Sequence, residues 1–179
     1  EARAQLLRIK AKNADFVIIQ ETTWATSVIL KDAKQLGIKT KFIGLNWCVD
    51  EKLIALAGEA AEGFMGVIPF VFTDSNLPGI QRILDYTRRK NIKIEGYMLR
   101  FIQGWVTAEV MLEGVKRAGN KISGTGIKKG LESISDYSTG GITAPITFSP
   151  SNHIGCNKLK IGKVVNTSWQ LITDYLSGS

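Results

Sequence analysis

The order of apolar segments in residues 1–70 constrains the fold more than any other feature of the sequence. Three short apolar runs, at 14–20, 41–45 and 64–70, have the length and the β-branched or aromatic content of strands. Segments with helical spacing precede the first run and separate the others. Such alternation predicts an α/β fold built on a parallel, doubly wound sheet with helices on its faces.

Individual residues support the expected starts and ends of these helices. Gly37 can supply the left-handed stop of the second helix, and Asp50 is a good N-cap for the third. The second helix is expected to bury an apolar face made of Val28, Ile29, Ala33 and Leu36.

Beyond residue 70 the pattern changes. A helix is expected from about Pro78, and 91–103 is interpreted as a connection to a helix over 105–118 that Gly119 stops. A short helix over 126–134 and a strand entering a turn at 140–153 follow. The last segment, 158–176, is expected to form two short strands joined by a polar turn.

Polar and aromatic groups follow the first two predicted strands. They are QETTW at 20–24 and NWC at 46–48. Ligands of open α/β sheets bind beyond the carboxyl ends of the strands, so both groups occupy the position of a pocket. In the alternative interpretation, Thr22 or Thr23 only caps the second helix and Trp24 packs on the sheet.

The charge distribution and the N-terminus do not indicate a particular partner or compartment. The net charge of +7 comes from 23 basic and 16 acidic residues spread along the chain, so no nucleic-acid partner is expected. The one basic run, 87–93, is interpreted as a solvated helix end. No membrane span or export signal is visible, and a chain that begins with Glu says little about its compartment.

The sequence contains no convincing catalytic or metal-binding motif. Cys48 and Cys156 lack metal-ligand spacing and form either one disulfide or two free thiols. His153, the only histidine, is interpreted as a turn residue that bonds locally. The glycines and lysines of 123–130 lack phosphate-loop spacing, and 166–168 matches a glycosylation sequon that is most simply a turn. No enzyme, metal or cofactor is therefore predicted.

Five segments resemble, in order, the extracellular ligand-binding receptors of branched-chain amino-acid ABC transporters, which are type I periplasmic binding proteins. The segments are AQLLRIKAKNADFVIIQ, DAKQLGIKTKFIGLNW, AGEAAEGFMGV, YMLRFIQGWVTAEVMLEGVKRAG and GITAPITFSPSNHIGCNKLKIGKVV. The resemblance covers nearly the whole chain and implies a fold of two α/β lobes that close on ligand like a flytrap. The chain resembles the carboxy-terminal half of such a receptor, apparently truncated at the N-terminus.

The resemblance also implies a division of the chain. Residues 1–95 would belong to the C-terminal lobe, 96–152 to the N-terminal lobe, and 153–179 would cross back to the C-terminal lobe. A lobe fragment without its own sheet buries little surface, so helix 105–118 would expose an apolar face. A missing N-terminal segment, a second chain or a rearranged fold would have to cover it.

The family's ligand-binding positions fall on three places in this sequence. They are Thr22 with its neighbours Gln20 and Thr23, Asn46 with Trp47, and Trp105 with Gln103. Hydroxyl and amide groups can orient a polar ligand, and an indole packs on an apolar body. Trp105 is alternatively a core residue.

One position departs from the family. Amino-acid-binding members commonly have a carboxylate where Asn46 stands, and a buried ammonium without a partner is costly. Either Glu21 supplies the charge, or the ligand is not an α-amino acid; an amide or a small or aromatic carboxylate would suit these groups.

The function implied by the resemblance is that of the solute-binding component of an ABC transporter. Such a receptor captures a small polar or amphipathic solute between its lobes and presents it to a membrane permease. It would be periplasmic or extracellular, with a lipid anchor as one form. A ligand-sensing regulatory domain of the same fold is the alternative, while a nucleotide-binding enzyme lacks support because no Gly-rich loop follows the first strand.

Overall fold

The computed structural model describes residues 2–74 and 76–178 of the chain, which form two compact units. Unit 1 comprises residues 1–69 and 160–174, and unit 2 comprises residues 70–159 and 175–179. The first boundary therefore follows Pro69, whereas the family resemblance places it near residue 95. The assignment of either unit to a lobe of a complete receptor stays a prediction.

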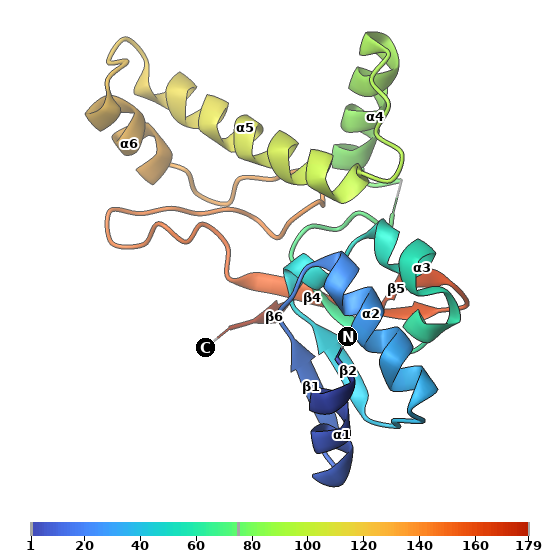
Figure 1. The fold of residues 1–179 in the computed structure, drawn as a ribbon. Helices are drawn as coiled ribbons and strands as arrows, with labels where there is room; N and C mark the ends of the chain where they lie inside the picture. The colour runs from blue at the N-terminus through green and yellow to red at the C-terminus, as the bar shows by residue number, and fades with distance from the viewer. Residues whose placement is uncertain (1, 75, 179) are drawn as a thin grey trace. The chain divides into compact units, whose positions relative to one another are not determined.

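Unit 1 is an α/β body built on a mixed sheet (Figure 1). Its strands run in the order β1-β2-β3-β4-β5, and β1, β2 and β3 are parallel. The fourth and fifth strands are antiparallel to their neighbours. The strands are β1 (Phe16–Ile19), β2 (Lys41–Gly44), β3 (Met65–Ile68), β4 (Lys158–Val165) and β5 (Ser168–Leu171).

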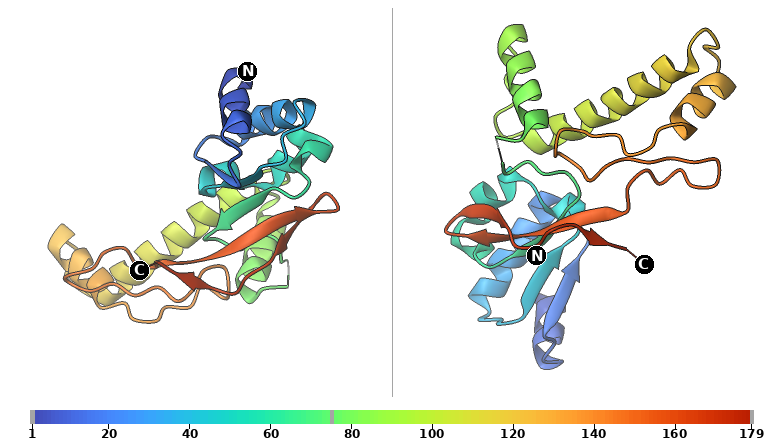
Figure 2. Two further views of the ribbon diagram at one scale, coloured as in Figure 1. Left: turned by 90° about the horizontal axis from the view of Figure 1, so that it is seen from below. Right: turned by 180° about the vertical axis from the view of Figure 1, so that it is seen from behind.

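Helices alternate with the first three strands, as predicted. They are α1 (Arg3–Ala11), α2 (Thr23–Gln35), the 3-10 turn η1 (Asn46–Cys48), α3 (Glu51–Ala57) and η2 (Gly58–Ala61). Strand residues that face these helices are buried, such as Ile19 and Phe42, while Phe16 and Ile18 on the other face are 53% and 70% exposed. Among the described residues of unit 1, the helices thus cover one face of the sheet (Figure 2).

Two predicted helix signals are confirmed. The Asp50 side chain accepts hydrogen bonds from Lys52 N and Leu53 N at the start of α3. Gly37 follows α2 with a φ of 61°, in the left-handed region that favours glycine.

The buried face of α2 differs from the prediction. Val28 and Ile29 are only half-buried, and the buried positions are Thr23, Thr26, Ser27, Leu30, Asp32 and Ala33. Hydroxyl groups are tolerated there because they bond back to the helix, from Thr26 Oγ1 to Thr22 O and from Ser27 Oγ to Trp24 O.

Unit 2 has a core formed largely by two helices and an irregular chain segment. Its elements are α4 (Pro78–Lys90), α5 (Met98–Ala118), α6 (Gly124–Glu132) and β6 (Leu176–Ser177), which pairs with the start of β4. The core side chains are Ile80, Ile83, Ile102, Val106, Val110, Ile134, Ile142 and Ile146. Close contact between α5 and α6 requires Gly130, because a Cβ there would lie 2.1 Å from Gly114 O.

Two expectations for unit 2 are wrong. The helix predicted over 105–118 begins at Met98, so much of the expected connection is helical. The strand expected at 140–153 is irregular, and its described pairing is limited to the isolated bridges Tyr137–Ile146 and Ser149–Asn152. The apolar face expected to be exposed on 105–118 is buried at Val106 and Val110, which belong to the core, whereas Met111 and Leu112 are 47% and 59% exposed.

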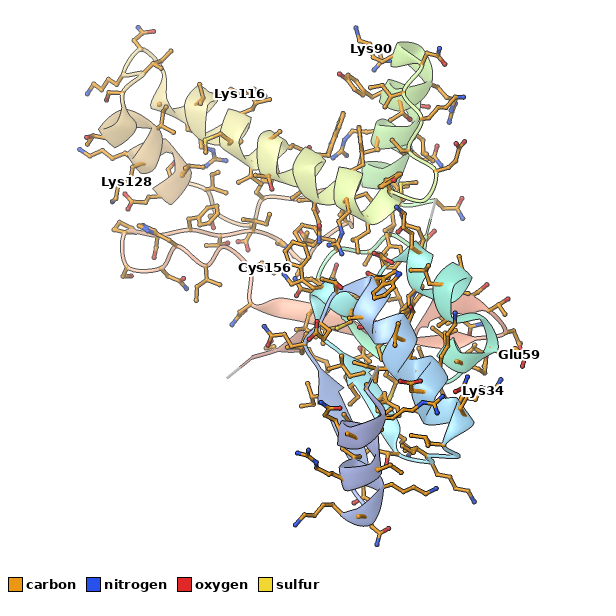
Figure 3. All side chains as sticks on the ribbon, in the orientation of Figure 1. Lys34, Glu59, Lys90, Lys116, Lys128 and Cys156 are labelled. Carbon is orange, nitrogen blue, oxygen red and sulfur yellow. The ribbon has the colours of Figure 1, made fainter. Side chains whose placement is uncertain are left out.

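The basic run at 87–93 is a solvated helix end, as predicted. Arg88, Arg89 and Lys90 are exposed in the last turn of α4, and Asn91 caps that helix in the left-handed conformation (Figure 3). Cations at this position interact favourably with the helix dipole.

Candidate functional site

The predicted ligand groups of unit 1 lie at one edge of its sheet. Because β1 and β2 are parallel neighbours, the loops that follow Ile19 and Gly44 leave the sheet at the same edge. Leu45 N donates to Ile19 O at 2.9 Å and continues the pairing to the base of the loops. QETTW and NWC therefore lie at the same side of the sheet, where the carboxyl ends of β1 and β2 are. This edge is called the rim.

Thr22 and Thr23 have different roles at the rim. Thr22 is exposed and is the N-cap of α2, where its Oγ1 accepts a long hydrogen bond of 3.5 Å from Ala25 N. Thr23 is buried; its Oγ1 donates to Asp50 Oδ2 at 2.6 Å and lies 3.3 Å from Trp47 O. The Thr23 hydroxyl thus ties the two loops together.

The Cys48 side chain holds the loop after β1 through contacts with its backbone. It is fully buried, and its Sγ lies 3.1 Å from both Ile19 O and Glu21 O. Glu21 N in turn donates to this sulfur at 3.2 Å. The thiol is free, as is that of Cys156 in unit 2, so the two-thiol alternative holds.

Asp50 is the centre of the polar network at the rim, and sequence reasoning gave it only the role of a helix cap. Its carboxylate binds Thr23 and two backbone N–H groups, while Asp50 O accepts from Trp169 Nε1 at 2.9 Å. A long-range contact from β5 leaves no signal in the local sequence around Asp50.

The groups left accessible at the rim are polar and aromatic. Gln20 and Thr22 are exposed, Asn46 is half-buried in η1, and Trp47 is 58% exposed. Trp24 is 68% exposed, so the alternative interpretation, in which it packs on the sheet, is wrong on this point. This surface combines hydroxyl and amide groups with two indoles, which suits a small amphipathic molecule.

The other two predicted ligand-binding residues, Gln103 and Trp105, belong to unit 2. The ring of Trp105 packs edge-on against Tyr86 at 5.1 Å and stacks on Phe101 at 6.4 Å between centroids. Gln103 Oε1 accepts from Arg100 Nη1 at 3.1 Å. Since Gln103 and Trp105 are two positions apart on α5, they do not share a face of the helix. Their ligand role stays a prediction.

A hollow in unit 1 lies at the opposite edge of the sheet, where the amino ends of β1 and β2 are. Its lining includes Phe16, Lys39, Lys41 and Glu62, and it contains no predicted ligand residue. Lys34 and Glu59 beside it form an ion pair at 2.8 Å (Figure 3).

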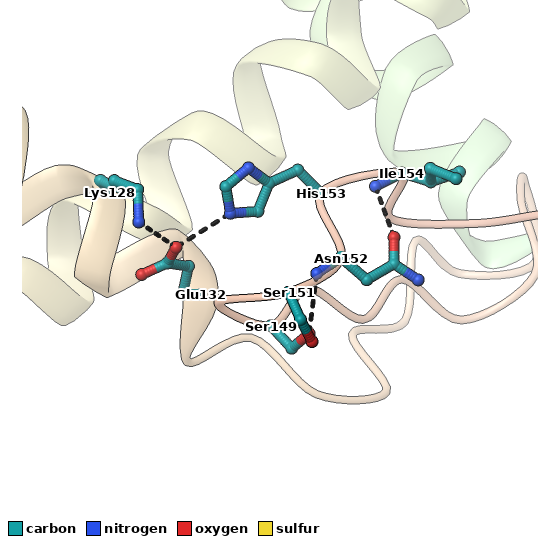
Figure 4. Close-up of polar contacts among 7 residues, drawn as sticks. All are labelled: Lys128, Glu132, Ser149, Ser151, Asn152, His153 and Ile154. Carbon is teal, nitrogen blue, oxygen red and sulfur yellow. Dashed lines mark hydrogen bonds and ion pairs between the residues drawn. The ribbon is translucent and has the colours of Figure 1, made fainter.

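A separate charged cluster in unit 2 contains the only histidine of the chain (Figure 4). His153 Nε2 lies 2.9 Å from Glu132 Oε1, and Lys128 Nζ binds the same oxygen. The prediction that His153 bonds locally is wrong, because its partner lies on α6. The hydrogen bond from Lys128, followed by that from His153, lowers the pKa of Glu132, and burial opposes them.

Two general features of the described residues bear on function. Within residues 2–74 and 76–178, no three His, Cys, Asp or Glu side chains are grouped so that they could hold a metal ion. Over the same ranges, no helix has the length and apolar character needed to cross a bilayer.

The fold of this chain is that of a periplasmic binding protein. The sequence profile of the periplasmic binding protein family matches residues 1–168, so the chain belongs to this family. The resemblance inferred from the sequence is confirmed.

Relatives support the same conclusion. The leucine-, isoleucine-, valine-, threonine- and alanine-binding protein of Pseudomonas aeruginosa is 24% identical over 116 residues, which are 65% of this chain and 30% of that protein. A branched-chain amino-acid ABC transporter protein from Thermus thermophilus with bound valine superposes with a TM-score of 0.90 at 25% identity, over 100% of this chain and 50% of that one. A substrate-binding protein from Aeropyrum pernix gives 0.89 at 24% identity, with 99% and 48% covered. The chain thus spans about half the length of these structures, and their type I fold is its fold.

Proposed function

We propose that this chain is part of the solute-binding receptor of an ABC transporter, which captures a small polar or amphipathic solute without chemical conversion. The observation that carries the proposal is the rim of unit 1. There, two loops joined by the Thr23–Asp50 hydrogen bond present Gln20, Thr22, Asn46 and Trp47 at one edge of a parallel sheet. Relatives named for leucine, isoleucine and valine binding support the transport role.

The residue types at the rim define the proposed ligand range. Asn46 can donate and accept hydrogen bonds but cannot neutralise an ammonium, so an amino acid would need the exposed carboxylate of Glu21. Amides and small or aromatic carboxylates are the other members of this range. A membrane permease is the proposed partner, in the periplasm or outside the cell, with or without a lipid anchor.

A ligand screen by thermal shift tests the proposal. The full-length protein is heated with amino acids, amides and aromatic acids, one at a time. A ligand present at about 100 times its Kd adds about 2.7 kcal/mol to the stability of the protein, which produces a clear rise in Tm. Absence of a shift with every compound would count against a solute receptor.

The variant Asn46→Glu tests the position of the site. A carboxylate there should move the ligand ranking toward compounds with an ammonium group, because the charge gains a partner. Asn46→Asp and Asn46→Gln are matched controls that separate charge from side-chain length. An unchanged ranking in Asn46→Glu would show that this residue does not face the ligand.

A sensory role would show a different pattern. A receptor for transport binds ligand and supports uptake by cells that contain its permease, whereas a sensing domain binds ligand but leaves uptake unchanged when its gene is deleted.

A further inference from the structure

Two exposed indoles distinguish the rim from the rest of unit 1. Trp24 and Trp47 are 68% and 58% exposed, whereas Trp169 in the same unit is only 8% exposed. Exposed indoles beside polar ligand groups suit a binding surface, because a large rigid ring can pack on an apolar body while its N–H stays available for a hydrogen bond. Trp24 lies in the first turn of α2 and Trp47 in η1, next to the predicted polar ligand groups in the sequence.

The backbone beneath both indoles is fixed by buried contacts. Trp24 follows Thr23, whose hydroxyl bonds Asp50, and the carbonyl of Trp47 lies 3.3 Å from that hydroxyl. Cys48, directly after Trp47, holds the loop after β1 through its sulfur. Because the backbone of both residues is already held in place, less conformational entropy is lost when a ligand packs on their rings, and this favours binding.

Acidic side chains outnumber basic ones in the two segments of the rim. Residues 20–24 and 46–52 contain Glu21, Asp50 and Glu51 and one basic residue, Lys52, although the chain as a whole carries a net charge of +7. Asp50 already accepts hydrogen bonds from Thr23 and from the start of α3. The rim therefore favours a neutral or cationic group and disfavours a carboxylate facing it.

We propose that the ligand of this receptor has a flat aromatic ring that packs on Trp24 and Trp47, with an amide or ammonium group directed at the rim. The inference rests on the proposed function and narrows its ligand class. Indole faces attract both aromatic rings and cations, while Gln20 and Thr22 offer the neutral partners for an amide.

Matched compounds test this inference with the full-length protein. The aromatic series is phenylacetamide, phenethylamine and phenylacetate; the aliphatic series is 3-methylbutanamide, 3-methylbutylamine and 3-methylbutanoate. Titration calorimetry should give a Kd about tenfold lower for the aromatic amide or amine than for its aliphatic counterpart. Within the aromatic series, phenylacetate should bind most weakly.

Substitution of the indoles identifies their contribution. Trp24→Leu and Trp47→Leu should reduce the aromatic preference several-fold, while Trp24→Phe and Trp47→Phe should retain most of it because a ring remains. Phe16→Leu is a control at the opposite edge of the sheet, where the ring is 53% exposed and should not affect the ratio. Thermal unfolding verifies that each variant folds.

The outcomes separate this inference from the proposed function. Equal or tighter binding of aliphatic compounds, or a ratio unchanged in both Leu variants, would overturn the aromatic ligand and leave the solute receptor in place. If the Leu variants lose uptake but bind ligand normally, the aromatic ligand is also overturned, because the indoles would then contact the permease. If no compound binds, including the amino acids of the thermal-shift screen, both proposals are refuted.

Discussion

Thr23 and Asp50 join the loops that follow two neighbouring strands, through a buried hydrogen bond of 2.6 Å from Thr23 Oγ1 to Asp50 Oδ2. Asp50 also caps α3, and its carbonyl accepts from Trp169 Nε1 on β5. A single carboxylate residue thus couples the start of α2, the start of α3 and the antiparallel part of the sheet. The geometry of the rim depends on this connection.

Thr23→Val should destabilise the protein. Valine keeps the branched shape but removes the donor, so Asp50 loses a hydrogen bond to a charged group, at a cost of about 1.5–3 kcal/mol. Urea denaturation followed by circular dichroism measures the change. Thr22→Val, one residue earlier, is the matched control; its long, exposed cap bond predicts a cost of about 0.5 kcal/mol. Equal costs for both variants would contradict the structural role of Thr23.

Cys48 and Cys156 should differ in reactivity toward a thiol reagent such as DTNB. Cys48 is fully buried and bonded to the backbone around Ile19 and Glu21, whereas Cys156 is half-buried. In native protein, only the Cys156 thiol should react readily, and Cys48 should react when urea unfolds the chain. Cys156→Ser should abolish the fast phase. A fast phase that persists in this variant would show that Cys48 is accessible.

Part of this structure could be predicted from the sequence because its signals are local. The strands of unit 1 follow from their apolar runs, and the Asp50 cap follows from the residue before α3. The start of α5 was missed because Gly104 interrupts the helical pattern, yet this glycine is exposed within the helix and contacts nothing that would exclude a side chain.

The candidate site was predictable only in part. The topology rule places Thr22 and Asn46 at one edge of the sheet, and the structure has their loops there. The sulfur contacts of Cys48 and the indole contact of Trp169 with Asp50 join residues far apart in sequence. Such contacts depend on the folded arrangement and leave no periodic pattern, as the buried hydroxyl groups of α2 also show.

Glu132 should contribute to stability only above acidic pH. Its pKa in the folded chain lies below the ordinary value of 4.5, chiefly because Lys128 donates to it and then because His153 does. A lowered folded-state pKa means that the stabilisation is fully present above about pH 4.5 and is lost as the pH falls through the folded value.

The variant Glu132→Gln tests whether this stabilisation is lost as the pH falls. The variant should have a lower urea midpoint than the parent at neutral pH, and the difference should shrink as the pH is lowered below about 4.5. Glu95→Gln, at an exposed position outside the helices, is the control. His153→Asn should retain part of the effect because Lys128 still binds the carboxylate. A difference that is constant with pH would rule out the ionised carboxylate as its source.

Trp105 should behave as a packing residue of unit 2 when stability is measured. Its Nε1 is buried and has no hydrogen-bond partner among the described residues, so phenylalanine would lose no such bond there. Trp105→Ala should cost up to about 3–5 kcal/mol through the cavity left beside Tyr86 and Phe101, whereas Trp105→Phe should cost less because a ring still fills most of that space. Urea denaturation measures both, and ligand titration of the Phe variant adds the test of a pocket role. Normal stability of Trp105→Ala with weakened ligand binding would assign the indole to a pocket wall, because a side chain that supports a core cannot be removed without loss of folding energy.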